Sequence, residues 1–121
     1  MLPIYIIKLN SNLDDLKNWI KYSNTTGQDV FYIPTLNTFS EVKIVFLLNN
    51  APHTFSQSFS FSRHDYLAGS IPITLGNPNS WLYIAFVMSL GTSGSSATIS
   101  TATLTAQNCK SNLVVDVWYK P

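Results

Sequence analysis

The chain has 121 residues, of which seven are Lys or Arg and six are Asp or Glu, so its formal net charge is +1. Hydrophobic residues make up 45% of the sequence, which is enough to build a core and argues against disorder. A nucleic-acid binder held by phosphate contacts would need an excess of basic residues, and a disulfide scaffold cannot form from the single Cys109. We therefore expect one folded domain that binds no nucleic acid.

The first residues of the chain do not have the pattern of a targeting segment. The apolar stretch within Met1–Lys8 is short and no basic residue precedes it, whereas a secretory signal needs a longer apolar region after a positive start. No run of the sequence approaches the ~18 consecutive apolar residues of a membrane span. The sequence therefore predicts no signal peptide and no membrane insertion.

Residues 11–22 are compatible with two local structures. Leu13, Leu16 and Ile20 would share one face of a short helix. A strand over residues 17–23 accounts for the same segment, and the sequence does not decide between the two.

After a turn at Thr26-Gly27, the rest of the chain has the pattern of short strands separated by Pro, Gly and Asn. Seven or eight strands at intervals of about 8–12 residues indicate an antiparallel sandwich or barrel and not alternating βαβ units. The fold class is therefore predicted to be all-β, with a lead over residues 1–22 and a β-sandwich domain over residues 23–121. Strands are expected at residues 29–33, 41–48, 54–62, 71–75, 81–89, 97–106 and 113–119.

Two of these strands carry more specific expectations. In residues 54–62, phenylalanines alternate with serines, which predicts one buried face and one face that shows hydroxyl groups. Pro72 removes a ladder donor and predicts an edge position for residues 71–75. A hairpin turn is expected at residues 107–112, between the last two strands.

The residues that could bind a metal are few and poorly spaced. His53, His64, Asp65 and Cys109 include no C-x₂-C or H-x₃-H pair. His64 and Asp65 are neighbours, so on a strand their side chains would point to opposite faces. We expect no metal site and no cofactor.

Catalytic patterns are equally sparse. The Gly91–Ser96 loop contains no G-x-S-x-G elbow. Among six acidic residues, Asp65 and Asp116 are the least implausible pair for glycoside hydrolysis, which requires two carboxylates across a cleft. The sequence favours a protein that is not an enzyme. A small hydrolase would require two ionisable groups within hydrogen-bond reach in a pocket.

The abundant Ser, Thr, Asn, Tyr and Trp side chains suit neutral polar ligands such as glycans. Hydroxyls and amides match sugar hydroxyls, and an aromatic face packs on the apolar side of a pyranose. The candidate ligand-binding residues are Tyr66, with Arg63 and His64 in the same loop, and Trp81. We expect Trp81 and Trp118 in the sandwich core, which leaves Tyr66 as the more exposed aromatic residue. The same set of neutral side chains suits a surface for assembly, because contacts between such surfaces would desolvate no ions.

A series of features follows in order over residues 23–120. They are the Thr25-Thr26-Gly27 turn, a short strand ending at Pro34, Phe39-Ser40-Glu41-Val42, Thr54-Phe55-Ser56, a loop around Tyr66 and Gly69, and the closing Val115-Asp116-Val117-Trp118-Tyr119-Lys120. In the order of its features and in their residue types, this series resembles a domain found near the C-termini of bacteriophage tail and baseplate proteins and in fibre-like virion proteins.

That resemblance implies a jelly-roll-like sandwich that acts as a structural or receptor-binding module of a fibre, tail or capsid decoration. The expected partners are copies of the chain, with a trimer favoured, other virion proteins and a host-surface glycan. The implied location is the virion, after synthesis in the host cytoplasm. The alternative function is a stand-alone carbohydrate-binding module.

Overall fold

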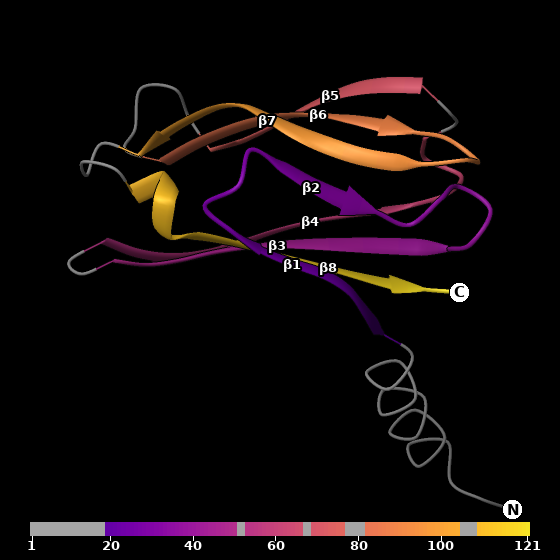
Figure 1. Ribbon diagram of the computed structural model, residues 1–121, viewed down its shortest axis with the longest axis horizontal. Helices are drawn as coiled ribbons and strands as arrows, with labels where there is room; N and C mark the ends of the chain where they lie inside the picture. The colour runs from indigo at the N-terminus through magenta and orange to yellow at the C-terminus, as the bar shows by residue number, and fades with distance from the viewer. Residues whose placement is uncertain (1–18, 51–52, 67–68, 77–81, 105–108) are drawn as a thin grey trace, which may run out of the picture.

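The computed structural model describes residues 19–50, 53–66, 69–76, 82–104 and 109–121 (Figure 1). Within these residues the chain forms eight strands and one short 3-10 helix. They are β1 (Ile20–Thr26), β2 (Val30–Ile33), β3 (Glu41–Asn50), β4 (His53–Ser62), β5 (Gly69–Gly76), β6 (Leu82–Leu90), β7 (Ser95–Leu104), η1 (Cys109–Asn112) and β8 (Leu113–Lys120).

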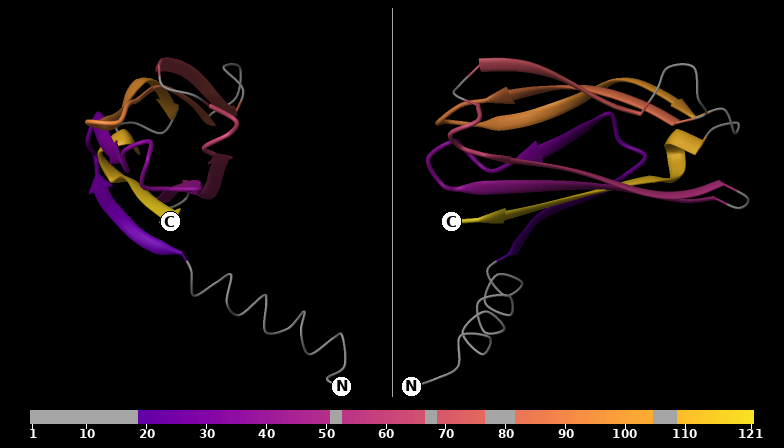
Figure 2. Two further views of the ribbon diagram at one scale, coloured as in Figure 1. Left: turned by 90° about the vertical axis from the view of Figure 1, so that its right-hand side faces the viewer. Right: turned by 180° about the vertical axis from the view of Figure 1, so that it is seen from behind.

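The strands form two four-stranded antiparallel sheets. Sheet A has the order β1-β8-β3-β4, and sheet B has the order β2-β7-β6-β5. The two sheets lie face to face and are not closed into a barrel (Figures 1 and 2). The prediction of an all-β antiparallel sandwich is confirmed.

The topology combines long-range pairs with hairpins. The pairs β1–β8 and β2–β7 place the first two strands beside the last two, one pair in each sheet. The other neighbours include the hairpins β3–β4, β5–β6 and β6–β7. β7 and β8 do not pair, so the expected hairpin at residues 107–112 is wrong. β8 instead lies between β1 and β3, and strand periodicity carries no information about which strand is the partner.

The core lies between the inner faces of the two sheets. Phe31 of β2 and Phe86 of β6 come from sheet B, and Phe46 of β3 comes from sheet A; all three are buried. Their ring centroids are 5.5 to 5.9 Å apart. Edge-to-face and tilted ring pairs contribute about 0.5–1.5 kcal/mol each beyond their buried area. This cluster therefore joins the two sheets into one core.

The expected alternation in β4 is confirmed. Phe61 is buried and Phe59 packs against the core, while Ser58 and Ser60 are exposed on the opposite face. β5, which contains Pro72, is an edge strand of sheet B, as predicted.

β1 begins at Ile20, so the strand alternative holds for residues 20–22, while residues 11–18 lie outside the described part of the chain. The strand ends in a tight turn at Gly27, whose φ is +67° and whose backbone N–H donates to the carbonyl of Leu113 at 2.9 Å. A Cβ atom there would lie 2.6 Å from the backbone oxygen of Ser111. Positive φ and this close approach both select glycine.

Candidate binding surfaces

The outward-facing side chains of sheet A form the first candidate surface. Residues that pair directly across antiparallel strands share a face, so the register aligns Lys21, Trp118, Lys43 and Ser60 in one row and Asn24, Asp116, Val45 and Ser58 in the next. We call this surface the charged face. It consists of these two rows together with Glu41, Leu47, Ser56, Ser62, Val114 and Lys120.

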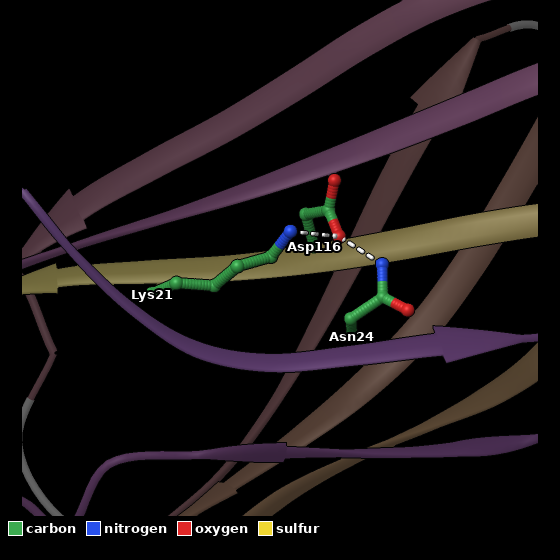
Figure 3. Close-up of polar contacts among 3 residues, drawn as sticks. All are labelled: Lys21, Asn24 and Asp116. Atoms are coloured by element: carbon green, nitrogen blue, oxygen red, sulfur yellow. Dashed lines mark hydrogen bonds and ion pairs between the residues drawn. The ribbon is translucent and has the colours of Figure 1, made fainter.

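Asp116 is the best-connected carboxylate of the charged face (Figure 3). Its Oδ1 lies 3.3 Å from Nζ of Lys21 and accepts a hydrogen bond from Nδ2 of Asn24. The side chain of Asp116 is 13% exposed and that of Lys21 is 46% exposed. Solvent screening at the lysine therefore limits the ion pair to about 1 kcal/mol or less.

Two indoles lie beside this network, and each has a lysine ammonium over its ring. Nζ of Lys21 is 5.1 Å from the ring centroid of Trp118, and Nζ of Lys120 is 4.7 Å from that of Trp19. Lys120 also pairs with Glu41 at 3.3 Å. These contacts favour this arrangement of the indoles and the lysines, with about 0.5–1 kcal/mol expected for each exposed cation–π contact.

A shallow pocket opens on the charged face between the two indoles. It is lined by Trp19, Lys43, Val45 and Trp118 and has a volume of about 220 Å³. Within the described part of the chain, the two carboxylates of this face pair with other lysines, Asp116 with Lys21 and Glu41 with Lys120, and no ion pair involves Lys43. Among these residues the pocket therefore combines apolar walls with one ammonium group that has no carboxylate partner.

The outward-facing side chains of sheet B form a contrasting surface. None of the residues in its four strands is charged. The exposed residues include two large ones, Val30 at 38% and Tyr32 at 60%. We call this surface the hydroxyl face. Its members are Val30, Tyr32, Ser70, Pro72, Thr74, Tyr83, Ala85, Val87, Ser89, Ser96, Thr98 and Ser100.

The loop after β4 carries three of the four predicted ligand-binding residues. His64 is exposed, and Arg63 and Tyr66 are partly buried. The ring of Tyr66 lies 5.5 Å from that of Phe61 and 6.4 Å from that of Phe59, so part of this side chain packs on the core. The loop brings these residues together, and their role in ligand binding stays a prediction. Trp81 lies outside the described residues.

The expectation that Trp118 belongs to the core is wrong. Its neighbours in the alternation of β8 are Val114 and Asp116, and all three point outward from sheet A. Asp116 could have indicated the outward orientation of Trp118, because residues two positions apart on a strand share a face and a charged residue usually faces solvent. The pocket itself was missed, since its walls come from β8, β3 and the residue before β1, which only the sheet order brings together.

The acidic side chains considered for catalysis have separate partners. The Oδ2 of Asp65 accepts the backbone N–H of Ser62 at 2.9 Å in the loop after β4, whereas Asp116 is engaged by Lys21 and Asn24. Within the described ranges, no three His, Cys, Asp or Glu residues lie close enough to hold a metal ion. No helix in those ranges has the length and apolar character needed to cross a membrane.

Comparison with known proteins adds no family assignment. No family model matches the sequence, no characterised protein is significantly similar to it, and no solved structure is significantly similar to its fold.

Proposed function

We propose that this chain is a non-enzymatic structural module of a virion, part of a fibre, tail or capsid decoration, that assembles with copies of itself. The observation that carries the assembly proposal is the hydroxyl face, because sheet B has no charged residue in any of its strands. The virion context comes from the order of sequence features over residues 23–120. The expected assembly is a homotrimer.

A surface that is buried against another loses its contacts with water, and the free-energy cost depends on which groups it exposes. Desolvating an ion costs several kcal/mol unless a partner charge compensates for it, whereas hydroxyl groups can exchange hydrogen bonds with a neighbouring chain. The exposed Val30 and Tyr32 add apolar area at the β2 edge of this face, and aromatic residues are enriched in interfaces. The hydroxyl face therefore suits contact with a second copy better than the charged face does.

Light scattering after size-exclusion chromatography tests this proposal. Thr98 is exposed on β7 and pairs with Val30 on one side and Val87 on the other, so it marks the middle of the hydroxyl face. We expect the unmodified protein to have three chain masses at micromolar concentration and Thr98→Lys to shift it to the monomer. Ser58→Lys, at an exposed position of β4 on the charged face, is the matched control and should remain assembled.

Two results would contradict the proposal. A monomeric unmodified protein would remove self-assembly altogether. An assembly that tolerates Thr98→Lys and dissociates with Ser58→Lys would place the interface on the charged face. Circular dichroism of both variants distinguishes dissociation from loss of the fold.

A second candidate function is carbohydrate binding, favoured by the two indoles that line the pocket of the charged face. Tryptophan rings offer a flat apolar surface for a sugar ring, and the adjacent serines of β4 offer hydroxyl groups. This activity uses the sheet opposite to the proposed assembly surface, so both can belong to one protein.

A further inference from the structure

We infer that the pocket formed by Trp19, Lys43, Val45 and Trp118 binds a carboxylated sugar, with Lys43 as the group that holds the carboxylate. This inference rests on the carbohydrate-binding candidate above and names its site and ligand class. It does not depend on assembly through the hydroxyl face.

The charge of the pocket comes from Lys43. The charged face holds the ammonium groups of Lys21, Lys43 and Lys120 but only two carboxylates within the described residues, those of Glu41 and Asp116. Both carboxylates lie 3.3 Å from another lysine. Among the described residues, Lys43 therefore has no carboxylate partner at the pocket wall, and an anion is the complementary ligand.

Trp19 and Trp118 provide aromatic walls, which favour a ring with an apolar face over a small inorganic anion. The volume of about 220 Å³ lies below the roughly 300–1,000 Å³ of pockets for drug-sized molecules. The pocket therefore fits about one sugar ring.

A row of hydroxyl groups lies beside the pocket. Lys43 pairs directly with Ser60, and Val45 pairs directly with Ser58, so two exposed serines of β4 continue the same two rows. Hydroxyl groups donate and accept hydrogen bonds, which matches the hydroxyls of a sugar. An acidic peptide side chain would use the ammonium group and leave this row without a function, so we favour the sugar.

The pocket is also built to hold its walls in place. Lys21 lies over Trp118 and pairs with Asp116, while Lys120 lies over Trp19 and pairs with Glu41. Pre-ordered walls reduce the entropy that binding must overcome. Lys43 is the member of this lysine set whose ammonium group remains available to a ligand.

The test compares sugars that differ in one group. Isothermal titration of the full chain with galacturonate, N-acetylneuraminate and galactose, at equal ionic strength, measures the preference for a carboxylate. We expect at least one of the acids to bind more tightly than galactose, and its affinity to fall with added salt. Lys43→Met removes the charge and keeps a side chain of similar length. We expect it to weaken binding of that acid about tenfold and to leave the affinity for galactose unchanged.

Arg63→Met tests the competing predicted site, because it removes one positive charge from the loop that contains Tyr66 and His64. It should leave binding of the acids unchanged. Loss of binding in Arg63→Met but not in Lys43→Met would overturn the pocket assignment and place the ligand at that loop. Equal affinity for galactose and both acids would retain carbohydrate binding and overturn the carboxylate inference. Absence of binding to all three sugars would overturn both carbohydrate binding and the carboxylate inference. It would not bear on assembly, which light scattering measures independently.

Discussion

The charged face and the hydroxyl face are built on the same architecture and differ in what they expose. Each lies on a four-stranded antiparallel sheet whose other side packs into the common core. Sheet A holds all the lysines and acidic residues found in the described strands, and sheet B holds none. Removing an ion from water costs much more free energy than removing a hydroxyl group, so the two faces suit different contacts. One suits a solvated or charged ligand, and the other suits a dry neutral interface.

The largest expected effect tests whether the two sheets form one cooperative unit. Phe86→Ala removes a buried ring of sheet B that contacts Phe46 of sheet A and Phe31. We expect the free energy of unfolding to fall by about 3–5 kcal/mol, because burial is lost and a cavity remains. Urea denaturation followed by tryptophan fluorescence and by far-UV circular dichroism should give one coincident transition. Separate transitions would show that the sheets are stabilised independently.

An intermediate effect is expected from the ion network that distinguishes sheet A. Asp116→Ala removes the partner of Lys21 and Asn24, and we expect a loss of about 1 kcal/mol in the free energy of unfolding. The loss should shrink in 1 M NaCl, since part of it is a screened ion pair. Ser58→Ala, an exposed neighbour on the same face, is the control and should change stability by less than about 0.5 kcal/mol. An equal effect of the two substitutions would show that the network adds nothing to stability.

The smallest effect is expected on the hydroxyl face. Thr98→Val keeps the β-branched shape of an exposed strand residue and removes only its hydroxyl group. We expect the free energy of unfolding of the folded chain to change by less than about 0.5 kcal/mol. If the hydroxyl face assembles, we expect the melting temperature to rise with protein concentration both for the unmodified protein and for Thr98→Val. A melting temperature of Thr98→Val that does not depend on protein concentration would contradict this expectation. It would show that hydroxyl contacts hold the assembly, and not the shape and lack of charge of the face.

Much of the fold could be predicted from local patterns. The alternation of phenylalanine and serine in β4 located both of its faces, and Pro72 located an edge strand. These signals are local because the period of two and the missing N–H of proline act within a single strand. The hairpin expected before β8 failed because a turn sequence does not reveal whether the chain reverses within a sheet or crosses to the other one.

The candidate site was harder to predict. Trp118 was expected in the core because a large aromatic residue is usually buried, although the alternation through Asp116 indicated the outer face. Lys43 stands 75 positions before Trp118 in the sequence, and the two become neighbours only through the β3–β8 pairing. No local pattern could place an ammonium group beside that indole.

The sequence by itself determined that this protein is an all-β domain with little charge, in which strands such as β4 have one buried and one exposed side. These properties follow from composition and from the period of two, which a single strand can express on its own. The tertiary structure alone decided how the strands are shared between the sheets. By placing the uncharged strands together in sheet B and the charged ones in sheet A, strand pairing separated two surfaces that no single segment of the chain contains.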